Sequence, residues 1–131
     1  MTAPVEEWVA KAEGDAASAL RELRARKYPN YDSACFHAQQ CVEKHLKAAL
    51  VHHATPFPKI HDLETLLDLC LPIHPLWEAM RNDLQLLTQY AVQFRYPGET
   101  ADKDDAKKAV VAMMRTRTII QAALPKINPP L

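Results

Sequence analysis

The sequence contains very little glycine: Gly14 and Gly98 are the only two among 131 residues. A glycine-rich loop that wraps a phosphate is therefore excluded, because such loops need several closely spaced glycines. Aromatic residues make up only 7% of the chain, whereas alanine and leucine dominate it. These side chains lose little conformational entropy in a helix, so the composition predicts a helical protein.

The chain also lacks an excess of either charge, since 16 basic and 16 acidic residues give a formal net charge of zero. A role with RNA or DNA would therefore have to rest on a local basic patch. The three cysteines form no Cys-x-x-Cys pair, and no apolar run approaches the ~18 residues of a membrane span. With no signal peptide either, we expect a reduced, cytoplasmic protein without a membrane segment.

Ten prolines separate the periodic apolar segments of the chain and interrupt none of them. Apolar residues at spacings of three and four predict helices. The five predicted helices run from Val5 to about Arg26, from about Tyr31 to His53, from Leu63 to about Leu71, from about Pro75 to Phe94, and from near Thr100 or Asp102 to Leu124.

The short connections between these helices favour antiparallel neighbours. At this length a single domain can bury a core without metal or disulfide. The sequence therefore predicts one all-α domain over residues 1–131, an up-and-down antiparallel bundle of four long helices and one short helix. An extended tail is expected at about 125–131.

The second predicted helix carries a polar stripe opposite its apolar one. Its members are Gln39, Gln40, Glu43, Lys44 and Lys47. Residues four apart are neighbours on a helix surface, and such a stripe is typical of a solvated face with one Glu–Lys pair contributing ~0.2–0.5 kcal/mol. A ligand-binding surface is the alternative interpretation.

Three segments, in this order, resemble the HEPN domain family, whose name stands for "higher eukaryotes and prokaryotes nucleotide-binding". They are HAQQCVEKHLKAAL in the second predicted helix, KIHDLETLL after the following loop, and YAVQFRYPGE at the end of the fourth helix. The opening segment, with its tryptophan and AEGDAASAL, is also similar. The resemblance covers essentially the whole chain and implies a helical bundle, usually a homodimer, with a polar groove at or near the dimer interface.

The resemblance also implies partners. Many prokaryotic relatives are small proteins encoded beside a minimal nucleotidyltransferase in toxin–antitoxin-like or defence modules, and other relatives are ribonucleases. By match to the family segments, the candidate ligand-binding residues are Gln40, Glu43, Lys44, Lys47, His61, Arg95 and Tyr96.

The signature of the ribonuclease relatives is an arginine followed, after four to six residues, by a histidine. Counting from Arg95, that histidine would occupy position 100, 101 or 102, where this chain has Thr100, Ala101 and Asp102. No histidine follows His74. The tyrosine-adenylylation motif of other relatives builds on the same histidine, so both catalytic patterns are absent, and we assign no catalytic residue.

The leading hypothesis is therefore a homodimeric binding subunit for a nucleotide or an RNA-like polyanion. Arg95 offers a planar donor fork for phosphate, the two lysines of the second helix add positive charge, and Tyr96 can stack on a base. The alternative for Arg95 is a structural ion pair, for instance to Glu43 or Asp102. We expect Tyr96 to be partly buried.

Two other functions stay open. One is a pure interaction module, in which the polar residues are structural and the dimer scaffolds or blocks a partner. The other is a ribonuclease toxin with a non-standard base such as His61 or His45. The support for a metal centre is weaker. His37, Cys41 and His45 recur every four residues, but Cys41 belongs to the apolar stripe of the second predicted helix. No other histidine fits a ligand motif, so neither metal nor cofactor is expected.

Overall fold

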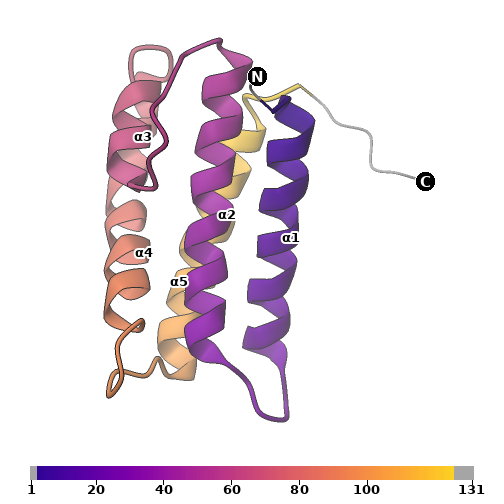
Figure 1. Ribbon diagram of the computed structural model, residues 1–131, viewed down its shortest axis with the longest axis vertical. Helices are drawn as coiled ribbons and strands as arrows, with labels where there is room; N and C mark the ends of the chain where they lie inside the picture. Colours follow the sequence, from indigo (N-terminus) through magenta and orange to yellow (C-terminus); the bar gives the residue numbers. More distant parts are fainter. Residues whose placement is uncertain (1–2, 126–131) are drawn as a thin grey trace, which may run out of the picture.

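The computed structural model describes residues 3–125, which contain helices and no strand. The elements are α1 (Val5–Arg24), α2 (Tyr31–His52), α3 (Leu63–Cys70), a 3-10 helix η1 (Pro75–Met80), α4 (Arg81–Gln93) and α5 (Lys103–Gln121). Figure 1 shows the long helices running side by side with their connections at the two ends. The predicted all-α bundle of four long helices and one short helix is confirmed. The predicted tail lies, from residue 126 onward, outside the described residues.

The central helix of the bundle is α2, which packs against α1, α3, α4 and α5. Its residues 45–50 are buried on every side of the helix. Small side chains let the neighbouring helices approach closely, and those with no exposed surface are Ala34, Cys35, Ala38, Cys41, Ala48 and Ala49. A helix that is buried all round must also bury its polar residues, which sets the environment of most of the candidate site.

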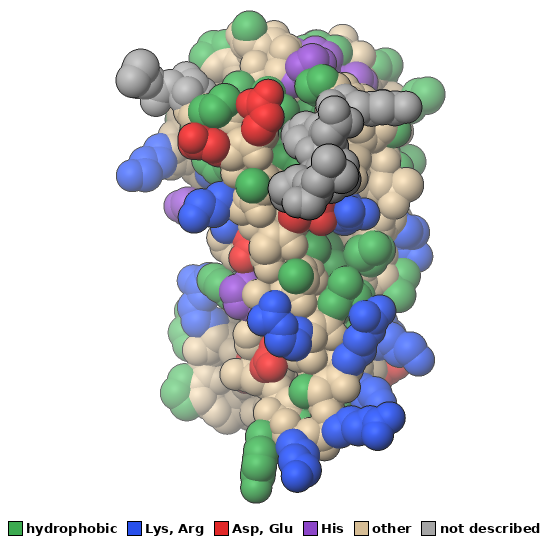
Figure 2. Space-filling view, turned by 90° about the vertical axis from the view of Figure 1, so that its right-hand side faces the viewer, with side chains coloured by type: hydrophobic (Ala, Val, Ile, Leu, Met, Phe, Trp, Pro, Cys, Tyr) green, Lys and Arg blue, Asp and Glu red, His purple; other side chains and the backbone are tan. Residues whose placement is uncertain are grey.

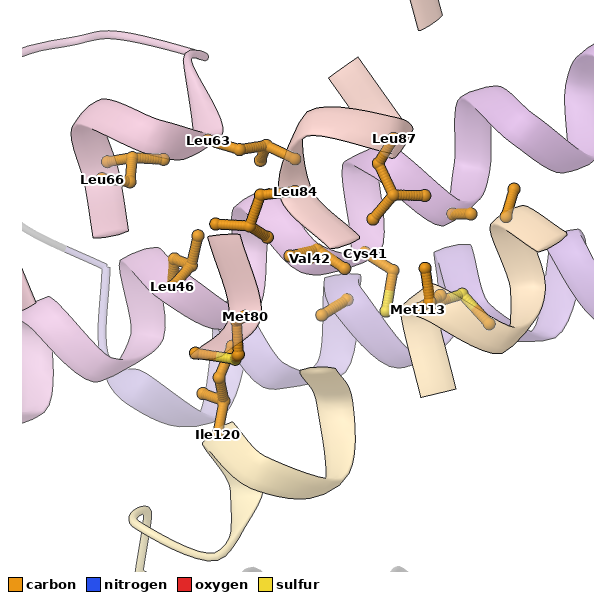
Figure 3. Close-up of a cluster of buried hydrophobic side chains, with 14 of the residues drawn as sticks. Cys41, Val42, Leu46, Leu63, Leu66, Met80, Leu84, Leu87, Met113 and Ile120 are labelled. Carbon is orange, nitrogen blue, oxygen red and sulfur yellow. The ribbon is translucent and has the colours of Figure 1, made fainter. Parts of the chain in front are cut away.

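The core takes side chains from all the other elements as well. Figure 3 shows a part of it, in which α2 contributes Cys41, Val42 and Leu46, and the other helices contribute Leu63, Leu66, Met80, Leu84, Leu87, Met113 and Ile120. Burying one large aliphatic side chain of this kind stabilises the fold by roughly 1.5–3 kcal/mol relative to exposure. No helix within residues 3–125 is both long enough and apolar enough to cross a membrane.

Side-chain caps fix where three of the helices begin. Asn30 accepts a hydrogen bond from the amide of Ser33 at the start of α2, and Asp62 accepts one from Thr65 at the start of α3. A capping box joins Asp102 and Asp105 at the start of α5. Each cap satisfies an amide that would otherwise have no partner in the first helical turn.

The predicted fourth helix, Pro75–Phe94, is divided in the structure. Residues 75–80 form the 3-10 helix η1, and α4 begins at Arg81. A 3-10 helix has three residues per turn, so Trp77 and Met80 lie one above the other, and both are buried. Three-residue spacing at this point is what directs both large side chains into the core.

The chain turns sharply after α4, where the sequence reads Phe94-Arg-Tyr-Pro-Gly98. Gly98 has φ 90°, a conformation that glycine adopts without steric cost. The amide of Ala101 then donates to the Asp32 carboxylate at 2.7 Å. The start of α5 is thereby attached to the start of α2.

Candidate functional site

The candidate residues lie in separate places. Glu43, Lys47 and His61 meet in one cluster, whereas Arg95 lines a cavity with Ser33 at the start of α2. Ten residues of helix separate Ser33 from Glu43, which corresponds to about 15 Å along the axis. Within one chain, the two lysines and Arg95 therefore do not form the single groove that the sequence suggested.

The Glu43 carboxylate is the centre of the first cluster. Its Oε2 atom accepts hydrogen bonds from Lys47 Nζ at 3.1 Å and from His61 Nδ1 at 2.9 Å, and its Oε1 atom accepts one from Gln39 Nε2 at 3.4 Å. Glu43 and Lys47 are only 3% and 4% exposed. The interpretation of this stripe as a solvated face is therefore wrong for these residues.

Two aromatic side chains from other segments cover the cluster. The Lys47 ammonium lies 5.5 Å from the ring centroid of Trp8 in α1 and 6.0 Å from that of Phe57 in the loop after α2. These rings meet edge to face. A cation over an aromatic face gains about 0.5–2 kcal/mol, so the site holds the lysine by its carboxylate partner and by both rings.

His61 is the solvent-facing member of this cluster, with 73% of its side chain exposed. Nδ1 faces the buried Glu43 carboxylate, so in the neutral ring the proton is on Nδ1 and the lone pair is on Nε2. This is the arrangement in which a carboxylate orients a histidine to accept a proton.

The candidates Gln40 and Lys44 are engaged inside the protein. Lys44 Nζ donates to Asp15 of α1 at 2.5 Å, and His37 shares that carboxylate at 2.9 Å. Gln40 Nε2 donates to Gln39 Oε1 at 2.9 Å. Sequence reasoning missed Asp15, because it stands 29 residues before Lys44 and no local spacing connects them. Both candidate lysines are thus already paired with carboxylates.

Arg95 lines a cavity of about 360 Å³ between the start of α2 and the end of α4. The other lining residues are Asn30, Asp32, Ser33, Phe36, Tyr90, Ala91 and Phe94. The ion pairs to Glu43 or Asp102 that were the alternative for Arg95 do not form, since Glu43 binds Lys47 and Asp102 caps α5. Within residues 3–125, Arg95 has no salt-bridge partner. Its guanidinium is available to a ligand.

Tyr96 is 62% exposed, so the expectation of partial burial is wrong. The buried tyrosine of this region is Tyr90, at 8% exposure, and its ring lies 5.3 Å from that of Phe94. Burial, together with the nearby Asp105 carboxylate, raises the pKa of Tyr90 above its ordinary value. Like any tyrosine hydroxyl at neutral pH, that of Tyr90 is protonated and can donate a hydrogen bond, and the raised pKa extends this to more alkaline pH.

A second buried network surrounds His45, which has no exposed surface. Its Nδ1 donates to the carbonyl of Cys41 at 3.0 Å, and its Nε2 accepts from Gln121 at 3.1 Å. Burial lowers the pKa of His45 and outweighs the opposing effects of the Cys41 carbonyl and of Glu13. His37 points instead to Asp15, whereas the Cys41 Sγ atom lies 3.4 Å from His45 Nδ1, so the three residues considered as metal ligands do not converge on one point.

A local basic patch does occur on this chain of zero net charge. It lies at the end of α1 and in the following loop, and its exposed members are Arg21, Arg24, Arg26 and Lys27. Figure 2 shows lysine and arginine side chains gathered over the lower half of the face that carries α1. The loop leads into Asn30, which lines the Arg95 cavity. The patch and the cavity therefore occupy the same end of the bundle.

Comparisons with known proteins agree with this architecture. The family model described as "HEPN domain" matches residues 5–122. The crystal structure of an archaeal HEPN homologue superposes with a TM-score of 0.64 and 22% sequence identity, covering 92% of this chain and 98% of the archaeal one. That identity supports the shared fold alone. No curated protein matches the sequence.

Proposed function

The chain belongs to the HEPN domain family, and from this membership we propose that it is a non-catalytic binding subunit for a nucleotide or an RNA-like polyanion. It would act in the cytoplasm as one HEPN domain spanning residues 1–131. The observation that carries the proposal is Arg95, which has no ion-pair partner within residues 3–125 and lines a cavity with three aromatic side chains.

The lining of this cavity suits the parts of a nucleotide. The Arg95 guanidinium can bind a phosphate through two parallel hydrogen bonds. Phe36 and Phe94 offer aromatic faces for a base, and Asp32 can accept a hydrogen bond from a ribose hydroxyl. A volume of about 360 Å³ falls within the range typical of small-molecule sites, roughly 300–1,000 Å³.

The basic patch at the end of α1 favours a ligand longer than a mononucleotide. Four cationic side chains, Arg21, Arg24, Arg26 and Lys27, are exposed at the same end of the bundle as the cavity. Each phosphate that such a patch neutralises releases counterions, so affinity should fall steeply with salt. A short RNA strand bound at Arg95 would gain these contacts, whereas a single nucleotide would not.

The positions after Arg95 support a binding role without turnover. Ala101 is 3% exposed and donates its amide to Asp32, while Asp102 caps α5. The chain therefore has a packing residue and a cap where the ribonuclease relatives have a histidine. General acid–base catalysis needs a titratable group in reach of the substrate, and these positions supply none that is free.

Calorimetric titration with ATP, GTP and a short single-stranded RNA tests the proposal. We expect Arg95→Ala to weaken RNA binding at least tenfold, which corresponds to about 1.4 kcal/mol. The matched control is Arg115→Ala, which removes an equal charge. Arg115 belongs to α5, does not line the cavity and is paired with Asp83. Absence of binding at millimolar ligand, with an intact Arg95→Ala fold, would reject the proposal.

The proposed binding subunit is a homodimer. Phe36 lines the cavity, and Val92 and Tyr96 directly follow the lining residues Ala91 and Arg95 in the sequence; the three side chains are 44%, 52% and 62% exposed. Exposed large apolar or aromatic side chains near one another favour contact with another protein. Light scattering should report a dimer that Val92→Asp dissociates; a monomer at all concentrations would contradict it.

The minimal nucleotidyltransferase of a toxin–antitoxin-like or defence module is the proposed second partner, on the basis of family membership. Co-expression with a neighbouring reading frame of that type tests this part directly. A stable complex that Tyr96→Asp weakens would support it. Failure of the two proteins to copurify would favour the simpler alternative of a scaffold dimer with structural polar residues.

One observation favours a catalytic alternative, a ribonuclease that uses His61 as its base. The Glu43 carboxylate orients His61 at 2.9 Å and leaves most of the ring exposed to solvent. Incubation of labelled RNA with the wild type and with His61→Ala separates the two functions. Cleavage that His61→Ala abolishes would establish the enzyme, and equal background in both would reject it.

A further inference from the structure

Two histidines meet at the other end of α2, away from Arg95. His53 directly follows the last residue of α2, and His74 directly precedes η1. Their Nε2 atoms are 2.8 Å apart and their ring centroids 4.8 Å apart. The 22 residues of α2 place this pair roughly 33 Å from the start of that helix, so it is independent of the proposed polyanion site.

The His74 ring and the backbone of both histidines are held by ordered structure. The His74 ring stacks on Trp77 with a centroid distance of 4.1 Å and an interplanar angle of 10°, and Trp77 is only 6% exposed. The His74 amide donates to Cys70 at 2.9 Å, and the His53 amide donates to Ala49 at 3.1 Å. The backbone of both residues and the ring of His74 are therefore in place before any ligand arrives.

We propose that His53 and His74 bind a divalent transition-metal ion, Cu²⁺ or Ni²⁺, through their two Nε2 atoms. Metal–imidazole bonds of about 2.0 Å that meet at a right angle place the two nitrogens about 2.8–2.9 Å apart, whereas a tetrahedral zinc site requires about 3.3 Å. The observed 2.8 Å, which is also an ordinary hydrogen-bond length, is compatible with the right angle of tetragonal Cu²⁺ and Ni²⁺ and is shorter than the tetrahedral separation.

The proton balance of this site is simple. Without metal, one Nε2–H donates to the lone pair of the other Nε2, so the two rings are different tautomers. On binding, that proton moves to Nδ1 of its own ring, and both Nε2 lone pairs become metal ligands. Neutral rings bind the ion without net release of a proton from the pair.

The site is open. Within residues 3–125, no group of three or more histidine, cysteine, aspartate or glutamate side chains is placed to enclose a metal. The remaining positions of the ion are therefore left to water, and both protein ligands are half-buried at the surface. A bound ion would connect the end of α2 to the segment between α3 and η1.

Titration of tag-free protein with Cu²⁺ and with Ni²⁺, in a weakly coordinating buffer, tests the proposal. We expect one ion per chain, and an electron paramagnetic resonance spectrum of the Cu²⁺ form with coupling to two imidazole nitrogens. His53→Gln and His74→Gln should each lower the affinity at least tenfold. The control His37→Gln, which alters a histidine bound to Asp15, should bind as the wild type does.

Thermal unfolding supplies a second readout. Added Ni²⁺ should raise the Tm of the wild type and of Arg95→Ala, but not that of His53→Gln, because only a ligand of the folded state stabilises it. His74→Gln removes the stacking on Trp77 and can therefore weaken the fold itself. His53→Gln leaves that stacking in place, so its effect on metal binding decides the test in that case. Equal affinity in the wild type and His53→Gln, or a Cu²⁺ spectrum without imidazole nitrogens, would overturn the proposal.

Discussion

Replacing Glu43 by glutamine isolates the energetic role of the polar cluster on α2. Glu43→Gln keeps the size of the side chain and its hydrogen-bonding oxygen but removes the negative charge. The Lys47 ammonium, 4% exposed, then has no anionic partner among residues 3–125. The ammonium is then left with the uncharged amide oxygen of the variant and the rings of Trp8 and Phe57.

The expected cost follows from this burial. Removing one partner of a buried ion pair typically destabilises a protein by ~3–5 kcal/mol, because the other charge remains without compensation. The two rings already face the ammonium in the wild type, so they offset little of the loss. Since the free energy of unfolding of a small domain is about 5–15 kcal/mol, Glu43→Gln should remove a large part of the stability.

Urea unfolding followed by far-ultraviolet circular dichroism measures this loss. The comparison requires that the slope of the free energy of unfolding against urea concentration is the same in both proteins. The control Glu99→Gln, in an exposed turn, should stay within about 0.5 kcal/mol of the wild type. Adding Lys47→Met to Glu43→Gln should recover most of the stability, because it removes the orphaned charge. A loss below about 1 kcal/mol for Glu43→Gln, or no recovery in the double variant, would refute this reasoning.

Three further predictions concern the buried networks and the caps. The lowered pKa of His45 means that the unfolded chain takes up a proton before the folded one, so stability should fall as pH drops below about 6.5; His45→Gln should show a smaller fall between pH 7.5 and 5.5 in urea titrations, and an equal fall would contradict it. Burial raises the pKa of all three cysteine thiols to about 12, so Ellman's reagent at pH 8 should modify none in the native protein and three in urea; rapid native modification would be the opposing result. Asp102→Ala removes the capping box of α5 and should cost about 0.5–2 kcal/mol in urea, more than Asp104→Ala; equal losses would count against the cap.

Most of the fold could be predicted from local patterns. The predicted helix from Tyr31 to His53 ends one residue from the observed α2, because apolar spacing and the Asn30 cap act within a few residues. The start of α5 was equally accessible through Asp102. Residues 75–80 are an exception: they form a 3-10 helix, and the three-residue spacing of Trp77 and Met80 fits one face of either helix type, so the apolar pattern does not distinguish them.

The candidate site could be predicted only in part, because burial depends on partners that are distant in sequence. A stripe of polar residues on α2 looks solvated until Trp8 and Phe57 are placed over Lys47. The pairing of Lys44 with Asp15 and of His53 with His74 likewise spans 29 and 21 residues. No spacing rule connects such pairs, whereas packing of the helices brings them together.

The most direct test of the proposed function is to locate the bound ligand. A titration of isotope-labelled protein with a short single-stranded RNA, followed by backbone amide chemical shifts, gives this location in one measurement. The largest shifts are expected at Ser33, Phe36 and Arg95, with smaller ones at the end of α1, and they should disappear in Arg95→Ala. Shifts centred on His61 and Lys47, or no shifts at millimolar RNA, would contradict a polyanion site at the Arg95 cavity.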